Sequence, residues 1–195
     1  MIINTIDTDQ KVFIVAEIGN NHEGDFKVAQ ELIRQATQAG VDAVKFQTFL
    51  PEYLAGGDVD RFSRLKDFQF SYDQFSELAR IAESEGTIFF STPFDPQSAN
   101  FLNEIQPLFK IASSDNTHWP FLQQIASFGK PLILSTGMTT LAEVTEMEKV
   151  IRKVWKDQVG DPGLAMLHCV SSYPAPVDQA NLKAVQTLSE HFPKC

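Results

Sequence analysis

Short apolar runs alternate with longer amphipathic runs six times along this chain, and this alternation restricts the fold more than any other feature. A short apolar run is typical of a buried strand, and a longer run with helical spacing is typical of a helix. Strands that are joined through helices lie parallel, with right-handed crossovers. The sequence therefore predicts an α/β protein made of six βα units.

Turn and capping residues set the expected bounds of these units. Ser71 with Gln74, and Thr140 with Glu143, have the spacing of capping boxes at helix starts. The segment 49–70 is expected to be a long loop, because it contains a proline and a glycine pair. The predicted strands are 12–18, 41–48, 87–91, 108–113, 131–135 and 164–169. The predicted helices are 25–39, 71–85, 96–104, 120–128, 140–156 and 179–191.

Polar residues at alternate positions of the strands distinguish between the two architectures that parallel βα units can form. Lys45 and Gln47 share one face of their strand, whereas Val44 and Phe46 share the other. The central strands of an open sheet are apolar on both faces. Polar groups late in several strands instead suit the interior of a TIM barrel near its active site. We therefore expect a TIM (β/α)8-type barrel, with about six of its eight βα units in this chain.

The two remaining units would have to follow the last residue of the sequence. We expect residues 1–195 to be the N-terminal part of one barrel domain, and no composition shift marks a boundary inside it. An opened barrel exposes strand edges and apolar surface, which favours association. The chain is accordingly expected to be either truncated or completed by another chain.

Charge and cysteine content exclude several classes of partner. The formal net charge of −9 argues against nucleic acid and anionic membrane surfaces, since both bind clustered Lys and Arg. No apolar run approaches the roughly 20 residues of a membrane span, and the first ten residues do not resemble a signal peptide. The two cysteines, Cys169 and Cys195, have no metal-ligand spacing, so a reducing cytoplasm is expected.

Two lysines lie inside apolar strand patterns, and a buried ammonium group needs an anionic partner. One interpretation of Lys45 and Lys110 is a structural ion pair with Glu17 or another carboxylate. The other is a site for an anionic ligand such as a phosphate or a carboxylate. Neutral donors at neighbouring strand ends would complete such a site: Thr92, Ser113, Ser135 and the backbone around Gly137.

Glu17 is the candidate acid or base, because it lies among these lysines and would stay ionised there. The alternative is that it serves only as a counter-ion. His22 and Glu23 follow the first strand, and we interpret them as loop hydrogen-bonding residues rather than metal ligands. His168, on an apolar strand, is interpreted as a core histidine with satisfied hydrogen bonds.

Motifs at the strand ends resemble, in the same order, those of the N-acetylneuraminate (sialic acid) synthase family. They span nearly the whole chain, which makes the resemblance more specific than any single motif. The matching segments are Ala-Glu-Ile-Gly-Asn-Asn-His-Glu-Gly at 16–24, Val-Lys-Phe-Gln-Thr at 44–48, Ser-Thr-Pro-Phe at 91–94, Lys-Ile-Ala-Ser at 110–113, Ser-Phe-Gly-Lys-Pro at 127–131, Leu-Ser-Thr-Gly-Met at 134–138, Leu-His-Cys at 167–169 and Tyr-Pro at 173–174.

The resemblance implies an enzyme that condenses phosphoenolpyruvate with an N-acylated amino sugar such as N-acetylmannosamine. In this family a divalent metal, Mn²⁺ or Mg²⁺, activates the sugar aldehyde. The C3 carbon of phosphoenolpyruvate attacks that carbonyl, water adds at C2, and phosphate leaves through C–O cleavage. The product is a sialic-acid-type nonulosonic acid, and the family assembles as a homodimer.

The resemblance also implies roles for individual residues. Glu17 matches the acid–base group, while Gln47 and Tyr173 match sugar contacts. The positions that match the phosphoenolpyruvate site are Lys45, Thr92, Lys110, Ser113 and Ser135.

Some positions depart from the family pattern. Asp115 stands where such synthases often have Glu, so the sugar is expected to be a relative such as a legionaminic- or pseudaminic-type precursor. Ser171 stands where they often have Asn, and it could still donate to phosphate. The two metal-binding histidines of the family would lie beyond Cys195, as would its C-terminal antifreeze-like domain.

Two other functions stay open on the sequence. One is a Schiff-base aldolase that uses Lys45 or Lys110 as its nucleophile. The other is a non-catalytic barrel fragment that binds a phosphorylated ligand or a partner. The condensing synthase requires no imine, and the non-catalytic protein would bind without releasing phosphate.

Overall fold

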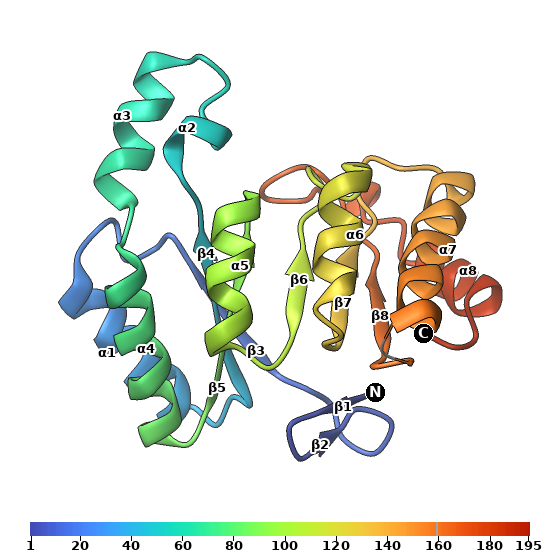
Figure 1. Cartoon of the computed structure of the whole chain (residues 1–195), viewed down its shortest axis with the longest axis horizontal. Helices are drawn as coiled ribbons and strands as arrows, with labels where there is room; N and C mark the ends of the chain where they lie inside the picture. Colours follow the sequence, from blue (N-terminus) through green and yellow to red (C-terminus); the bar gives the residue numbers. More distant parts are fainter. Residues whose placement is uncertain (159) are drawn as a thin grey trace. The chain divides into compact units, whose positions relative to one another are not determined.

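A computed structural model of the chain describes residues 1–158 and 160–195 (Figure 1). The chain divides into two compact units, one of residues 6–107 and the other of residues 1–5 with 108–195. Each unit is described by itself. Six parallel strands, each followed by at least one helix, confirm the predicted βα repetition.

The first unit contains a parallel sheet in the order β3-β4-β5. Its strands are β3 (Val15–Gly19), β4 (Ala43–Thr48) and β5 (Ile88–Pro93). Its longer helices are α1 (Phe26–Gln38), α4 (Tyr72–Glu85) and α5 (Pro96–Ile105). The apolar face of β4 is fully buried at Val44 and Phe46, and α1 and α4 contribute the buried Ile33 and Leu78. This core leaves the opposite face of β4 for Lys45 and Gln47, as the alternation predicted.

The sequence prediction was wrong at two places in this unit. Val12 is 78% exposed, and the strand begins only at Val15. The segment expected to be a loop contains α2 (Pro51–Leu54) and α3 (Val59–Phe68). Pro51 fits the first turn of α2, and the side chain of Asp58 accepts from the backbone N–H of Arg61 at the start of α3. No residue of α3 is buried, so the periodicity that marks a packed helix is weak there.

The second unit contains a parallel sheet in the order β6-β7-β8. Its strands are β6 (Phe109–Ile111), β7 (Leu132–Ser135) and β8 (Leu164–Leu167). Its helical segments are α6 (Trp119–Ser127), α7 (Leu141–Gln158), the 3-10 turn η1 (Val177–Gln179) and α8 (Lys183–His191). The last helix therefore starts four residues later than predicted. The two-residue strands β1 (Ile2–Ile3) and β2 (Ile6–Asp7), near the N-terminus, were not predicted.

Both predicted capping boxes are present. Ser71 Oγ accepts from the backbone N–H of Gln74, and Gln74 Oε1 accepts from the backbone N–H of Ser71. Thr140 and Glu143 exchange the same pair of hydrogen bonds at the start of α7. These reciprocal bonds satisfy backbone donors that a helix start would otherwise leave free, which is why the residue spacing located both helices.

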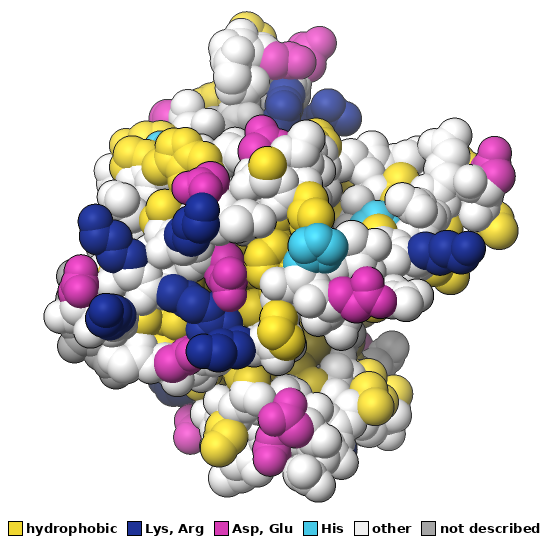
Figure 2. Space-filling view, turned by 90° about the vertical axis from the view of Figure 1, so that its right-hand side faces the viewer, with side chains coloured by type: hydrophobic (Ala, Val, Ile, Leu, Met, Phe, Trp, Pro, Cys, Tyr) yellow, Lys and Arg dark blue, Asp and Glu magenta, His cyan; other side chains and the backbone are white. Residues whose placement is uncertain are grey.

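The side that carries α7 and α8 mixes apolar and charged groups. Figure 2 shows hydrophobic side chains between Lys, Arg, Asp and Glu side chains on the face reached by turning Figure 1. Leu167 of β8 and Val185 of α8 are exposed apolar residues. β8 lies at the edge of its three-stranded sheet. Exposed apolar side chains such as these are expected beside the edge of an incompletely covered sheet. Within the part of the chain that the structure describes, no helix has the length and apolarity to cross a membrane.

Candidate active site

An ion pair links the first two strands of the unit formed by residues 6–107. Glu17 and Lys45 are register partners in β3 and β4, and Lys45 Nζ lies 2.6 Å from Glu17 Oε2. Lys45 Nζ also donates to Thr92 Oγ1 on β5 at 3.1 Å. The Lys45 side chain is 13% exposed and that of Glu17 is 51% exposed. The ion pair with Glu17, one of the two interpretations of these lysines, is present for Lys45, and it leaves a half-exposed carboxylate beside a cation and a hydroxyl.

A β-bulge follows Glu17. Glu17 pairs with Lys45, but the next pair joins Gly19 to Phe46, so Ile18 is an extra residue on β3. Gly19 has φ +55°, a left-handed conformation that glycine adopts without steric cost. Asn20 Nδ2 then donates to Gln47 Oε1 at 3.0 Å. The bulge thus brings Asn20 into contact with the same polar face of β4 that Glu17 contacts.

His22 is a buried, neutral part of the loop after β3. Its Nδ1 accepts from the backbone N–H of Gly24 at 3.1 Å, which confirms the predicted loop hydrogen bonding. Its ring stacks on Phe70 with the centroids 4.2 Å apart. Burial lowers the pKa of His22 from 6.5 to about 4, because desolvation disfavours the charged imidazolium. His22 therefore supports the loop as a neutral side chain at physiological pH.

In the second unit, Lys110 lies on the polar face of β6 and is almost fully buried. Its Nζ donates to the backbone carbonyl of Ile111 at 2.9 Å. Burial raises the pKa of Asp115, while the Ser114 hydroxyl at 2.8 Å and the charges of His118 and Lys110 act in the opposite direction. Asp115 is therefore a carboxyl whose ionisation depends on its cationic neighbours.

The loops after β6 and β7 are joined by side-chain hydrogen bonds. Asn116, 1% exposed, donates to the carbonyl oxygens of Ser135 at 3.0 Å and Gly137 at 3.2 Å. The backbone N–H of Gly137 donates to Ser113 Oγ at 3.1 Å. The expectation that Gly137 frees a backbone donor for a ligand was wrong, because Ser113 takes that donor. The Ser113 hydroxyl keeps its own proton for a further partner.

The segment after β8 carries the last two predicted residues. Ser171 and Tyr173 are exposed, Tyr173 to 95%, and neither side chain makes a hydrogen bond within the described residues. His168 Nε2 lies 2.9 Å from the carbonyl oxygen of Ala180, so its predicted hydrogen bond is present, although the residue is only half-buried. The side chains of Ser171 and Tyr173 are thus accessible to a ligand.

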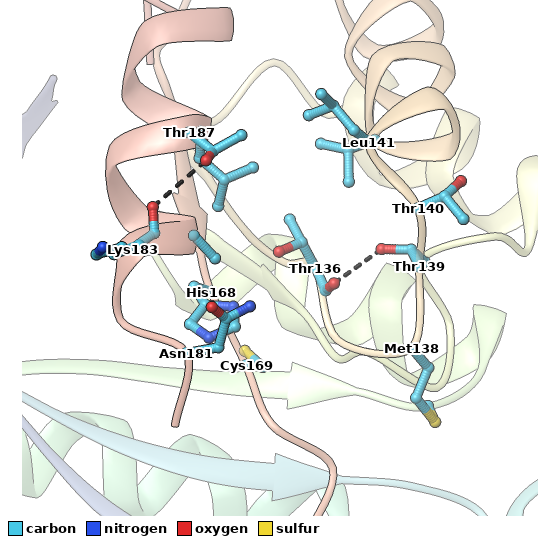
Figure 3. A pocket seen from close by; sticks show the side chains of 13 residues that line it. Thr136, Met138, Thr139, Thr140, Leu141, His168, Cys169, Asn181, Lys183 and Thr187 are labelled. Carbon is cyan, nitrogen blue, oxygen red and sulfur yellow. Dashed lines mark hydrogen bonds between the residues drawn. The ribbon is translucent and has the colours of Figure 1, made fainter. Parts of the chain in front are cut away.

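A pocket of about 610 Å³ lies in the second unit, between the end of β7, the start of α7 and α8 (Figure 3). The hydroxyl of Thr139 donates to the Thr136 carbonyl, and that of Thr187 donates to the Lys183 carbonyl. None of the ten predicted site residues lines this pocket. The hydroxyls of Thr136 and Thr140 donate as well, to the Leu167 carbonyl and to the Glu143 carboxylate. Since all four threonine hydroxyls of the pocket already have partners, its size alone does not make it the candidate site.

The described residues do not fit a metal site. Among them, no group of three or more His, Cys, Asp or Glu side chains is placed to hold an ion. The two cysteines of the described chain are free. The divalent metal that the resemblance implies therefore has no ligand set among the described residues.

Sequence reasoning missed three residues of the site. Gly19 and Asn20 stood inside a quoted motif, but strand alternation gives no sign of the bulge that places them. Asn116 directly follows Asp115, among other polar residues after β6. The feature that marks Asn116 is its burial after a strand, since a buried amide needs hydrogen-bond partners. Burial is visible only in the structure, so no usable signal for this residue is present in the sequence.

The fold and the polar strand ends define a class of protein. The chain has the α/β fold of TIM-barrel enzymes, with candidate groups late in its parallel strands. A family model described as the NeuB family matches residues 32–195, and the chain belongs to this family.

Individual relatives agree with this membership. The chain is 39% identical to an N,N'-diacetyllegionaminic acid synthase of Legionella pneumophila, over 92% of this chain and 54% of that protein. It is 40% identical to an uncharacterized protein, MJ1065, of Methanocaldococcus jannaschii, over 94% of this chain and 53% of that protein. A crystal structure of N-acetylneuraminic acid (sialic acid) synthetase from Leptospira borgpetersenii, in complex with citrate, aligns with a TM-score of 0.86 and 36% identity, over 92% of this chain and 61% of that chain. The chain spans about half the length of the curated relatives it matches.

Proposed function

We propose that this chain belongs to an enzyme that condenses phosphoenolpyruvate with an N-acylated amino sugar to give a nonulosonic acid and phosphate. The observation that carries the proposal is the cluster of Glu17, Lys45 and Thr92 on three neighbouring parallel strands of a NeuB-family chain. A half-exposed carboxylate beside an ammonium and a hydroxyl can bind an anionic substrate and exchange a proton with it.

The resemblance assigns the anionic groups of phosphoenolpyruvate to basic and hydroxyl side chains: Lys45, Thr92, Lys110, Ser113 and Ser135. The burial of Lys110 supports this role, because a buried ammonium group gains most from an anionic partner. Ser171, exposed after β8, is assigned as a further donor to phosphate.

The reaction forms one carbon–carbon bond and breaks one carbon–oxygen bond. The C2–C3 π electrons of phosphoenolpyruvate attack the sugar aldehyde carbon, and the aldehyde oxygen takes a proton. Water adds at the resulting C2 cation and loses a proton. Phosphate then leaves with the electrons of its C2–O bond, and the new C2 hydroxyl loses its proton and becomes the keto group. Glu17 is the group assigned to proton exchange, since its Oε1 lies outside the ion pair that Oε2 makes with Lys45.

Gln47 and Tyr173 are assigned to the sugar, and Asp115 is assigned as a further catalytic carboxyl. Asp115 has a shorter reach than the Glu that sialic acid synthases often carry, which favours a sugar related to N-acetylmannosamine rather than that sugar itself. The 39% identity to a legionaminic acid synthase supports a precursor of that type. The sugar carries an N-acyl group in each of these cases.

A ligand titration tests the proposal on the chain as it is. The folded chain is titrated with phosphoenolpyruvate while the phosphorus NMR signal of the ligand is followed, and Lys45→Met and Lys110→Met are titrated in parallel. Lys149→Met is the matched control, because Lys149 pairs with Glu146 at 2.7 Å on an exposed face. We expect saturable binding that each of the first two variants weakens about tenfold or more and that the control leaves unchanged.

Two outcomes would replace the proposal. Covalent trapping of a keto acid on Lys45 or Lys110 by borohydride would show a Schiff-base aldolase. Binding without phosphate release, in an assay of the chain extended through two more βα units that also supplies N-acetylmannosamine and Mn²⁺, would favour the non-catalytic protein. No binding by a folded chain would contradict the assignment of the phosphoenolpyruvate residues.

A further inference from the structure

The oxygen of the Gln47 side-chain amide makes a hydrogen bond with another residue that the structure describes, whereas its NH₂ group makes none. Asn20 Nδ2 donates to Gln47 Oε1, and the Gln47 NH₂ group makes no hydrogen bond within the described residues. A Cβ atom built on Gly19 would lie 3.3 Å from Gln47 Nε2 and 3.0 Å from Glu17 Oε1. The absence of a side chain at position 19 thus leaves room beside both the NH₂ group and the candidate acid–base carboxylate.

The orientation of this amide pair has a physical reason. Asn20 Oδ1 is buried and lacks a partner among the described residues. If both amides were turned over, the buried orphan would be the Asn20 NH₂ group, with two donors in place of one acceptor. Buried donors without partners are rarer and more costly than under-satisfied carbonyl oxygens. The orientation that presents the Gln47 NH₂ group outward is therefore the more stable one.

We propose that Asn20 is a positioning residue that makes Gln47 a hydrogen-bond donor to the substrate. The inference rests on the proposed function, in which Gln47 contacts the sugar. It follows that the sugar group facing Gln47 is an acceptor oxygen, of the N-acyl carbonyl or of a hydroxyl. The bulge before Gly19 is needed for this contact, because without the extra residue Asn20 would not lie opposite Gln47 in the register of the two strands.

The first measurement examines the amide orientation without any ligand. Side-chain NH₂ signals of the ¹⁵N-labelled chain are assigned to Gln47 and Asn20 by their loss in Gln47→Glu and Asn20→Asp. We expect the Gln47 NH₂ group to exchange rapidly with solvent and the Asn20 NH₂ group to exchange slowly. In Asn20→Asp the new carboxylate can only accept, so the Gln47 amide turns over and its NH₂ group becomes protected. A merely structural Asn20 would not produce this reversal.

A protected Gln47 NH₂ group in the unmodified chain would overturn the proposal, even if Asn20→Asp failed to fold. The same holds if the folded Asn20→Asp variant left the exchange of Gln47 unchanged. Both results come from the protein alone, so they are independent of whether the proposed reaction is correct.

The second measurement tests the consequence for the substrate. Binding of N-acetylmannosamine, in the presence of phosphoenolpyruvate, is followed by saturation-transfer NMR for the unmodified chain, Asn20→Asp and Gln47→Glu. We expect each variant to weaken sugar binding about tenfold, as for a lost hydrogen bond to a desolvated group. Binding that is unaffected by Asn20→Asp would overturn the positioning role while the proposed function stands. No sugar binding by the unmodified chain would count against the proposed function and against the substrate part of this inference together.

Discussion

Lys45 lies opposite Glu17 in the register of β4 and β3, and the two side chains form a 2.6 Å ion pair, with Thr92 as the second partner of the ammonium group. An ion pair between register partners needs no loop to position it. The strand pairing that builds the sheet also places the carboxylate, so the pair is as rigid as the sheet itself.

Removing the ammonium group of Lys45 should weaken phosphoenolpyruvate binding much more than it lowers the free energy of unfolding. Lys45→Met is expected to lower the free energy of unfolding by about 1 kcal/mol or less, because the half-exposed Glu17 carboxylate is rehydrated by water. Urea unfolding measures this, and the phosphorus NMR titration measures the loss of phosphoenolpyruvate binding. Lys149→Met should change neither quantity by a comparable amount. A loss of several kcal/mol in Lys45→Met would show that the pair is mainly structural.

A methyl group at Gly19 is expected to affect ligand binding more than stability. Gly19→Ala strains a left-handed residue, which costs about 1–2 kcal/mol, and it also crowds the Glu17 carboxylate and the Gln47 amide. Gly40→Ala is the matched control, since Gly40 has φ +88° and nothing within 4 Å of the added atom. Both variants should unfold more easily, but only Gly19→Ala should weaken the binding of N-acetylmannosamine in the presence of phosphoenolpyruvate. Equal binding by the two variants would contradict the role of the open space.

The buried His22 makes stability depend on pH on the acid side. Its folded pKa of about 4 lies below the unfolded value of 6.5, so the unfolded chain binds the proton first as the pH falls. The stabilising contribution is complete above pH 6.5 and is lost by about pH 4, with a total of up to ~3 kcal/mol.

Urea unfolding of the unmodified chain and of His22→Gln at pH 7, 5.5 and 4 measures this contribution. The difference between the two free energies of unfolding should shrink as the pH falls, because acid effects on other groups cancel. The exposed Thr117, replaced in Thr117→Ala, serves as a control without a titrating side chain and should show no such trend. A constant difference for His22→Gln would mean that His22 is not held neutral by burial.

Asn116 is expected to stabilise the second unit through its two carbonyl partners. Asn116→Ala leaves the Ser135 and Gly137 carbonyl oxygens without their donor and should cost about 1–3 kcal/mol. Asn116→Asp should cost more at neutral pH, since it places a carboxylate against two acceptors. Thermal or urea unfolding measures both, with the exposed Asn21→Ala as control. A cost for Asn116→Ala no greater than for Asn21→Ala would contradict this role.

The pKa of the Asp115 carboxyl group should depend on the positive charges of its neighbours Lys110 and His118. Burial raises its pKa, and Lys110 and His118 oppose that rise. Lys110→Met and His118→Gln are therefore each expected to raise the Asp115 pKa further, measured by carboxyl ¹³C NMR across the acid range. Lys153→Met, on the remote α7, is the control. A fall in the pKa in either variant would show that the opposing charges do not act on Asp115.

Much of the architecture could be predicted because it depends on local patterns. The two capping boxes and the alternation of β4 each involve residues only a few positions apart, so their side chains meet in the element they build. The helices within 49–70 could not be predicted in this way. They bury few residues and rely on a proline and an aspartate cap, which are equally common in loops.

The sequence by itself determined the parallel βα repetition, the polar face of β4 and the family of the chain, because periodicity and motif order are written in neighbouring residues. Only the tertiary structure decided which side chains meet. Residues 17 and 20 would lie on opposite faces of a regular strand, yet one bulge residue brings both Glu17 and Asn20 against β4. Residues that are distant in the sequence bury Asn116 and His22, and the burial of His22 lowers its pKa and keeps it neutral. No local sequence pattern encodes these contacts.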